Sequence, residues 1–308
     1  MNESKVLSLV IPVFNEKDSL EPLLTEIAEV AKQLPNRRPE VIFVDDGSTD
    51  GSWDTIASLA AKYAGVKGLK FRRNFGKAAA LSAGFRAATG DIVMTLDSDL
   101  QDDPHEIPDF LAKLDEGYDL VSGYKQQRND PIYKVFPSRV FNWLVSTVTG
   151  VKLHDHNCGF KAYRSAVVHD VKLYGELHRY IPVLAAAKGY KVGERVVNHR
   201  ARIFGASKFG FSRYLKGFLD LVQVTYTTNY GWRPMHFFGT IAFFCLLVSV
   251  GLFVVSAVIP SSFATLISLG FAFTLILIAS QSVFVGFLAE SAAKQIDAEP
   301  YTISDHAP

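Results

Sequence analysis

One long segment without charged residues limits the possible folds more than any other feature of the chain. From position 234 to position 289 there is no Asp, Glu, Lys or Arg. A membrane-spanning helix needs about 20 apolar residues, so this run is long enough for two, divided at the sequence IPSSF. We predict transmembrane helices over residues 235–259 and 263–289. They would form a hairpin, with a tail of residues 290–308 on the same side as the N-terminal part.

The segment before this run is basic. From Arg195 to Leu219 the chain has six basic residues and no acidic one. Each such residue near an anionic membrane surface contributes roughly 1 kcal/mol, and the positive-inside tendency places this face in the cytoplasm. Residues 209–233 also have apolar residues at helical spacing, namely Phe211, Leu215, Phe218, Leu219 and Val222. We predict an interfacial amphipathic helix there; an ordinary helix packed on the soluble domain is the alternative.

Residues 1–208 have the pattern of a cytoplasmic α/β domain. Apolar runs predict strands at 6–14, 40–46, 66–71 and 91–99, and amphipathic segments predict helices at 19–34, 52–63 and 77–88. This alternation indicates a mostly parallel sheet. The N-terminus has no basic region followed by a long apolar segment, so no signal peptide is predicted. We therefore expect a multi-pass protein of the cell inner membrane, with its first domain facing the cytoplasm.

Polar residues follow the end of each predicted strand. They are Asn15 and Glu16, Asp45 and Asp46, Arg72 to Asn74, and Asp97 to Asp99. In open α/β sheets ligands bind beyond the carboxyl ends of the strands, so these residues mark a candidate crevice. The chain has neither a GxGxxG nor a GxxxxGK[ST] motif, which argues against a Rossmann dehydrogenase and a P-loop ATPase. The net charge of +1 gives no support for nucleic acid binding.

The stretch TLDSDLQDDP concentrates the acidic residues of this crevice. Alternation along a strand would point Asp97 and Asp99 to the same side, where they would share a proton or bind a hard cation. Oxygen ligands suit Mg²⁺ or Mn²⁺. Asp102 and Asp103 are expected to start the next helix, because acidic residues are favourable near a helix N-terminus. His154 and His156 lack a third ligand at a spacing suited to zinc.

Six motifs in order carry a resemblance to a known family. They are IPVFNE, VDDGSTDGS, RNFGKAAAL, DSDLQDDP, NCGFKAYR and GASKFG, followed by the two predicted transmembrane helices. The chain resembles the family 2 glycosyltransferases of GT-A fold, and among them the polyprenyl-phosphate glycosyltransferases. The resemblance implies transfer of a hexose from a nucleotide-diphosphate sugar to polyprenyl (undecaprenyl) phosphate, with inversion. The two-helix tail resembles that of bacterial bactoprenol glucosyltransferases and favours UDP-glucose over GDP-mannose or a UDP-aminosugar.

The resemblance also implies roles for individual residues. The donor nucleotide would contact Pro12, Asn15, Glu16, Asp45, Asp46, Arg72, Lys77 and Asp97. A Mg²⁺ or Mn²⁺ ion would be held by Asp97, Asp99 and Gln101. The catalytic candidates are Asp99, Asp155 and Lys161, the last two in the loop expected nearest the transferred sugar.

The acceptor phosphate sets a different demand. A phosphate monoester is mostly a dianion near pH 7, so it needs fixed positive charge more than a general base. The candidates are Lys125, Arg128, Arg139, Arg200, Arg202 and Lys208. Membrane adhesion is the alternative role for Arg202 and Lys208, and packing is the alternative for Arg139. Asp155 is expected to orient the sugar or the acceptor rather than to act as a base.

Three other protein classes remain to be separated from this prediction. A processive polysaccharide synthase would resemble its group in a QxxRW motif and further membrane helices, which this sequence lacks. A non-catalytic protein that binds nucleotide sugar or lipid would show binding without turnover. A metal-dependent phosphatase would release free phosphate. Neither predicted span contains GxxxG, so helix pairing is not indicated and a homo-oligomer stays open.

Overall fold

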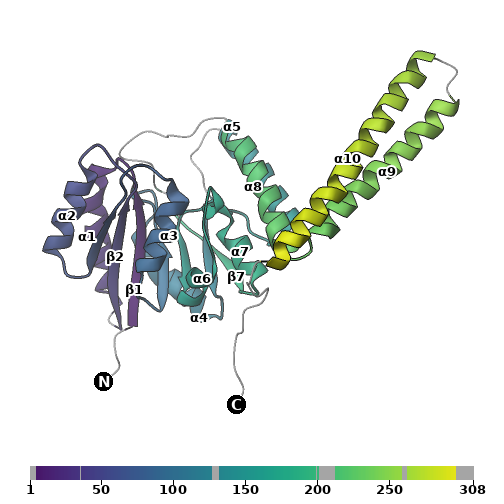
Figure 1. Ribbon diagram of the computed structural model, residues 1–308. Coiled ribbons are helices and arrows are strands. Elements are labelled where there is room, and N and C mark those ends of the chain that lie inside the picture. Colours follow the sequence, from purple (N-terminus) through teal and green to yellow (C-terminus); the bar gives the residue numbers. More distant parts are fainter. Residues whose placement is uncertain are drawn as a thin grey trace. The chain divides into compact units, whose positions relative to one another are not determined.

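The computed structural model describes residues 5–34, 36–126, 132–198, 200, 212–258 and 262–295. Within these ranges, the side chains of residues 132–137, 212–216 and 295 are not described. The chain divides into two units, residues 1–221 and 222–308 (Figure 1). Each unit is considered by itself.

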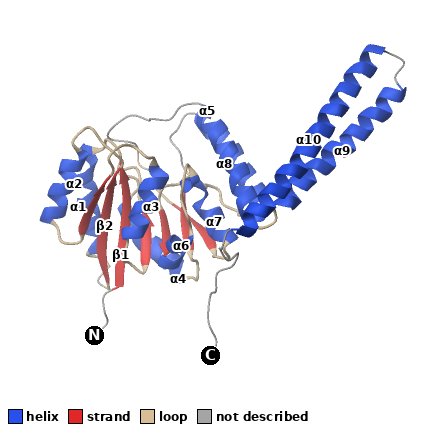
Figure 2. Cartoon of the chain, viewed as in Figure 1, coloured by secondary structure: helices blue, strands red, loops and turns tan. Residues whose placement is uncertain are grey.

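The first unit is built on a seven-stranded sheet with the order β3-β2-β1-β4-β6-β5-β7 (Figure 2). The strands are β1 (Lys5–Val13), β2 (Arg37–Asp45), β3 (Val66–Lys70), β4 (Ile92–Thr95), β5 (Leu120–Tyr124), β6 (Lys161–Arg164) and β7 (Val192–Val196). Strand β6 pairs antiparallel with both β4 and β5, and the remaining pairings are parallel. The predicted mostly parallel α/β fold is confirmed.

Helices cover both faces of the sheet. The helices of this unit are α1 (Leu20–Ala31), α2 (Ser52–Lys62), α3 (Lys77–Ala87), α4 (Ile107–Asp115), α5 (Ile132–Thr149), α6 (Ser165–Asp170) and α7 (Ile181–Ala187), with 3-10 turns η1 (Lys17–Ser19), η2 (Pro104–Glu106) and η3 (Leu177–Tyr180). Helices α1, α2 and α4 cover one face, and α3, α6 and α7 cover the other. Alternate side chains of β1 enter two separate cores: Leu9 packs with α1, α2 and α4, whereas Val10 packs with α3, α6 and α7. A sheet covered on both faces explains the continuous apolar runs of its parallel strands.

The helix predicted before the membrane segment is α8 (Ser212–Asn229). Of the predicted apolar face, Phe218, Leu219 and Val222 are exposed, as an interfacial helix requires. The side chains of Phe211 and Leu215 lie outside the described residues. The predicted domain boundary after residue 208 falls in the same undescribed stretch.

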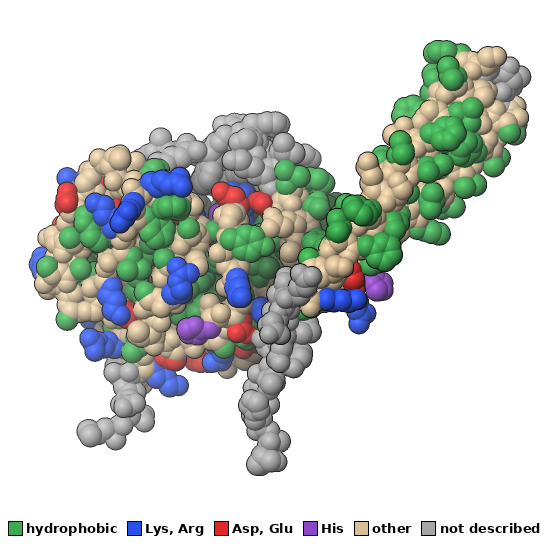
Figure 3. All heavy atoms as spheres, viewed as in Figure 1, with side chains coloured by type: hydrophobic (Ala, Val, Ile, Leu, Met, Phe, Trp, Pro, Cys, Tyr) green, Lys and Arg blue, Asp and Glu red, His purple; other side chains and the backbone are tan. Residues whose placement is uncertain are grey.

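The second unit contains two long apolar helices, α9 (Pro234–Val258) and α10 (Ser262–Gln295). Both are long and apolar enough to cross a membrane. They pack antiparallel through small residues: Ser249 Oγ donates to the Ala272 carbonyl (3.0 Å), and Gly286 faces Met235 and Phe238. Large apolar side chains cover the outside of the pair (Figure 3). Helix α10 continues beyond the predicted end at residue 289, and Glu290 and Lys294 form an ion pair in its last turns.

Candidate active site

Strands β1, β2 and β4 end at one edge of the sheet, and the antiparallel strand β6 begins there. Asp45, the last residue of β2, lies opposite Val13, the last residue of β1. Thr95, the last residue of β4, lies opposite Lys161, the first residue of β6. Pro12 is the penultimate residue of β1. The loops that follow β1, β2 and β4 therefore meet the loop that precedes β6.

Asn15 joins the loop after β1 to the loop after β2. Its backbone is left-handed (φ 54°), a conformation that asparagine tolerates better than most residues. Its N–H donates to Ser48 Oγ (2.9 Å), and its Oδ1 accepts from the Thr49 N–H (2.8 Å). The Glu16 N–H donates to Ser52 Oγ (3.1 Å). Both predicted donor-site residues thus help to hold the VDDGSTDGS loop.

The two aspartates at the end of β2 have different partners. Asp45 is fully buried, and its Oδ1 accepts from the Ser48 N–H (3.0 Å). Asp46 accepts from the backbone N–H groups of Phe75 (2.7 Å) and Gly76 (2.9 Å). Burial raises the pKa of Asp46 above its ordinary value, and these two hydrogen bonds only partly oppose the rise. Asp46 therefore orders the RRNFGK loop ahead of α3.

The RRNFGK loop places Lys77 beside Asp97, which is the first carboxylate of the Asp-x-Asp (DxD) motif at Asp97 and Asp99. Lys77, the first residue of α3, forms an ion pair with Asp97, and each side chain is about one-third exposed (32% and 31%). Burial opposes ionisation of Asp97, but Lys77, Lys125 and Lys161 together lower its pKa to about 2. Asp97 is therefore a carboxylate throughout the physiological pH range, and it remains accessible from solvent. Arg72, in the same loop as Lys77, is exposed.

A turn, and not a strand, sets the directions of Asp97 and Asp99. Strand β4 ends at Thr95, so the predicted alternation along a strand does not reach either carboxylate. Leu100 has a left-handed backbone (φ 61°), which costs roughly 1–2 kcal/mol for a non-glycine residue, and its side chain is buried. Asp99 is buried as well, and its Oδ1 accepts from the Gln101 N–H (3.2 Å).

The loop before β6 and the first residue of β6 place a buried aspartate and a buried lysine at the same end of the sheet. Asp155 accepts from the Asn157 N–H (3.0 Å). Lys161 Nζ donates to the Cys158 carbonyl and, at 3.5 Å, to the His156 carbonyl. Burial lowers the pKa of Lys161, whereas it raises the pKa of the Cys158 thiol to about 12, so this cysteine is not a nucleophile.

Gly159 lets this loop approach the DxD turn. A Cβ atom added at Gly159 would lie 2.7 Å from both carboxylate oxygens of Asp97. Thr95 Oγ1 donates to the Gly159 carbonyl (2.7 Å), which fixes the loop in this position. The structure thus brings Lys77, Asp97 and Lys161 into one electrostatic group at the end of β4.

The part of the chain that forms this end of the sheet matches a known family. The sequence profile described as "Glycosyl transferase family 2" matches residues 8–172, from β1 to the loop after α6. The chain is a family 2 glycosyltransferase. Asn15, Asp45, Asp97 and Lys161 all lie within the matched residues.

Two relatives extend the similarity of this glycosyltransferase over nearly its full length. It is 38% identical over 305 residues to the dodecaprenyl-phosphate galacturonate synthase of Rhizobium johnstonii, covering 95% of this chain and 89% of that protein. It is 36% identical over 293 residues to the undecaprenyl-phosphate 4-deoxy-4-formamido-L-arabinose transferase of Klebsiella pneumoniae, covering 93% and 88%. Both alignments are too long to be confined to the family 2 domain.

Solved structures agree on the fold of the glycosyltransferase. Glucosyl-3-phosphoglycerate synthase from Mycobacterium tuberculosis, solved with Mn²⁺, UDP and phosphoglyceric acid, matches with a TM-score of 0.56 at 18% identity, covering 73% of this chain and 78% of that one. Mannosyl-3-phosphoglycerate synthase from Rubrobacter xylanophilus matches with a TM-score of 0.55 at 15% identity, covering 72% and 73%. At such identities the likeness establishes the GT-A fold alone.

The cations predicted to bind the acceptor phosphate of the glycosyltransferase do not form one cluster among the described residues. Lys125 pairs with Asp102, and Arg139 is exposed on α5. Arg200 pairs with Glu26 and with Asp103, each at 2.7 Å. Arg128, Arg202 and Lys208 lie outside the described residues.

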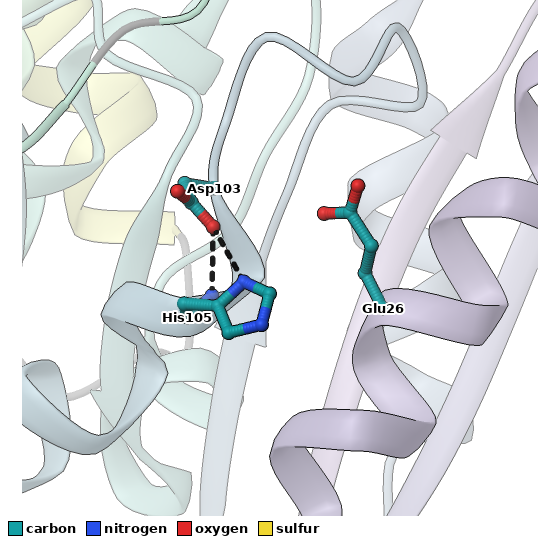
Figure 4. A group of neighbouring side chains, drawn as sticks. All are labelled: Glu26, Asp103 and His105. Carbon is teal, nitrogen blue, oxygen red and sulfur yellow. Dashed lines mark hydrogen bonds and ion pairs between the residues drawn. The ribbon is translucent and has the colours of Figure 1, made fainter.

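Arg200 also explains a group of side chains that resembles a metal site. One ligand atom from each of Glu26, Asp103 and His105 lies within 4.8 Å of the others (Figure 4). The Arg200 guanidinium binds both of these carboxylates, and Asp103 also accepts from the His105 N–H (3.0 Å). The positive charge that such a group requires is therefore supplied by arginine, and we assign no metal to it.

Asp102 is the acidic residue whose place in the glycosyltransferase differs most from expectation. Asp103 caps η2, as expected of a residue that starts a helix. The same expectation is wrong for Asp102, which is 1% exposed and pairs with Lys125 at 3.0 Å. In the sequence, a run of acidic residues before proline indicates a helix start for both aspartates. The two are distinguished only by Lys125, which lies beyond the next helix and strand of the chain.

A buried histidine gives the glycosyltransferase a predictable sensitivity to acid. His156 is fully buried, and its Nε2 lies 3.0 Å from Ser146 Oγ. Burial lowers the pKa of His156, and the charge of Lys161 lowers it further, to about 4. Because the unfolded state binds a proton near pH 6.5, the stability that this group contributes is present above pH 6.5 and is lost as the pH falls to 4. The loss amounts to about 3 kcal/mol at about 1.4 kcal/mol per pH unit.

We expect His156→Gln to reduce the fall in Tm of the detergent-solubilised protein between pH 7 and pH 5. Burial also lowers the pKa of His178, so His156→Gln should keep the part of the fall in Tm that His178 causes. His169→Gln, at an exposed position, is the matched control and should leave the fall unchanged. An equal fall in the wild type and in His156→Gln would contradict the assignment.

Proposed function

We propose that this glycosyltransferase transfers a sugar from a UDP-sugar to a polyprenyl phosphate, with inversion, at the cytoplasmic face of the cell inner membrane. The observation that carries the proposal is the 38% identity to a dodecaprenyl-phosphate galacturonate synthase over 95% of the chain. That span must include most of α9 and α10, which are suited to hold the enzyme beside a lipid acceptor.

The names of the relatives also bear on the sugar. They are a galacturonate synthase and a 4-deoxy-4-formamido-L-arabinose transferase. We therefore propose galacturonate first and the formamido-arabinose second. UDP-glucose, the donor predicted from the two-helix tail, stays a prediction and is tested beside them.

We propose Mg²⁺ or Mn²⁺ as the cofactor, held by Asp97, Asp99 and Gln101. The donor set fits a hard cation, because Asp97 is ionised and a second carboxyl and an amide follow it closely in the same turn. Lys77, which pairs with Asp97 and is about one-third exposed, would move aside for the cation, whereas Arg200 bridges two carboxylates at the other acidic group. Once bound, the cation would neutralise charge that develops on the departing diphosphate. The solved neighbour contains Mn²⁺ and UDP, but its 18% identity supports the fold alone, so the proposal rests on these oxygen donors.

The residues of the chain then share the remaining work. Lys77 provides positive charge at the end of β4, where two anionic substrates must approach one another, and the buried Lys161 lies at the same end. The acceptor phosphate is already a dianion near pH 7, so no residue has to remove a proton from it. Asp155 is buried and accepts from the Asn157 N–H, so it would orient the sugar by holding the loop before β6 in place and not by direct contact.

The proposal is tested by product analysis. Membranes containing the enzyme would be incubated with undecaprenyl phosphate, Mn²⁺ and, in separate reactions, UDP-galacturonate, UDP-4-deoxy-4-formamido-L-arabinose, UDP-glucose and GDP-mannose. We expect a glycosyl phospholipid and UDP from one of the first two donors, identified by mass spectrometry. Glycolipid from UDP-glucose alone would overturn the choice of sugar. Free phosphate, or no glycolipid from any donor, would overturn the proposed function.

A further inference from the structure

An ion pair beneath the DxD turn joins two strand ends that do not pair with one another. Lys125 follows β5 directly, and β6 separates β5 from β4 in the sheet. Its Nζ lies 3.0 Å from Asp102 Oδ1, and the two side chains are 14% and 1% exposed. Removing two charges from water is costly, so a pair buried in this place is expected to have a specific role.

Asp102 connects this pair to the candidate metal ligands. Its second oxygen, Oδ2, accepts from the backbone N–H of Asp97 (3.2 Å). The hydrogen bond closes a turn of residues 97–102, which contains both Asp97 and Asp99. Leu100 holds its left-handed backbone inside this turn. The side chain of Asp102 thus acts as a brace between the first and last residues of the turn.

The loops around the pair are closely packed. A Cβ atom at Gly123, two residues before Lys125, would lie 2.8 Å from Cys158 Sγ. A Cβ atom at Gly159, the residue after Cys158, would lie 2.7 Å from the Asp97 carboxylate. Burial alone would lower the pKa of Lys125, but Asp102, then Cys158 and Asp97, raise it, so the lysine stays charged. The lysine is therefore available as a permanent counter-charge to Asp102.

We propose that the Asp102–Lys125 pair is a positioning element, which holds the 97–102 turn so that Asp97 and Asp99 are set to receive the divalent cation. The inference rests on the proposed function, because it takes the cation from there. It also gives Lys125 a role different from the acceptor-phosphate contact predicted from the sequence. A lysine whose ammonium group is held by a buried carboxylate acts on the substrate through that carboxylate.

The test measures Mn²⁺ binding directly, by electron paramagnetic resonance titration of the full-length protein in detergent with saturating UDP. Four variants are compared with the wild type: Asp102→Asn, Lys125→Met, the double variant, and Lys125→Arg. The double variant leaves no uncompensated buried charge, so it remains informative if a single variant folds poorly. Lys113→Met, which removes the surface ion pair of Lys113 with Glu116 (2.6 Å), is the matched control.

We expect the first three variants to bind Mn²⁺ about tenfold more weakly, because they lose a group that orients the metal ligands. Lys125→Arg and Lys113→Met should stay within about twofold of the wild type, and the KM for undecaprenyl phosphate should change little in every variant. A tenfold rise of that KM in Lys125→Met with unchanged Mn²⁺ affinity would overturn the inference in favour of a phosphate contact. A lower Tm with unchanged Mn²⁺ affinity would overturn it in favour of a purely structural pair.

The outcome is separable from that of the proposed function, because the titration contains no acceptor lipid and no nucleotide-sugar donor. The expected Mn²⁺ pattern without glycolipid in the product assay would overturn the proposed function and leave the positioning role standing. Wild-type protein that binds no Mn²⁺ would overturn the positioning role, whatever the product assay shows.

Discussion

Replacing Asp99 with asparagine is expected to lower kcat/KM for sugar transfer about 1,000-fold at saturating Mn²⁺. Asp99 is 8% exposed and sits in the turn after β4, where asparagine keeps its shape and removes its charge. A bound cation contributes several kcal/mol of transition-state stabilisation in enzymes of this kind. Loss of about 4 kcal/mol corresponds to the expected factor at about 1.36 kcal/mol for each tenfold change. The measurement is the initial rate of glycolipid formation at varied donor concentration.

Asp54→Asn provides the control for this substitution. Asp54 is an exposed acid in the first turn of α2, away from the end of β4, and its replacement should leave kcat/KM unchanged. The Tm of Asp99→Asn should stay close to that of the wild type. Full transfer activity in Asp99→Asn would refute the proposed metal site.

The second large effect is expected at a residue without a side chain. In Gly159→Ala the new methyl group would meet the Asp97 carboxylate at 2.7 Å, a distance that Cβ atoms do not sustain. Either the carboxylate or the loop before β6 must shift. A misplacement of about 1 Å in a catalytic group can cost about 100-fold in rate, so we expect a loss of that order in kcat/KM.

Gly239→Ala separates this effect from the mere addition of a methyl group. No heavy atom lies within 4 Å of a Cβ built at Gly239, a position on α9, so this variant should retain wild-type activity. The apparent Mn²⁺ requirement of Gly159→Ala should also rise, because Asp97 is the group displaced. Wild-type activity in Gly159→Ala would show that the loop can retreat without consequence.

Strands β1 to β4 were predictable from the sequence, whereas β5, β6 and β7 were not. Strands β1 and β2 are buried on both faces, so they appear in the sequence as continuous apolar runs. Strand β6 has only four residues, KAYR, and includes a lysine and an arginine. Nothing in that segment indicates a strand, and its antiparallel direction depends on tertiary pairing with β4 and β5.

The candidate site residues could be named from the local sequence, but their partners could not. Asn15, Asp46 and Asp97 were found because each follows an apolar strand. The partners that define their roles come from elsewhere in the chain: Asp46 holds the backbone at Phe75 and Gly76, and Asp97 meets Lys77. Asp102 could not be separated from Asp103 by sequence, since its burial depends on Lys125.

The reversed strand β6 also has a consequence for the folding of the nascent chain. Strand β4 pairs on one side with β1, the first strand of the chain, and on the other with β6, which begins only at Lys161. Until residue 164 has left the ribosome, β4 is therefore an unprotected edge in the middle of the future sheet. A chain that stalls before β6 would expose that edge and would lack Gly159 and Lys161. Completion of the central sheet and assembly of the candidate active site are thus the same event in synthesis.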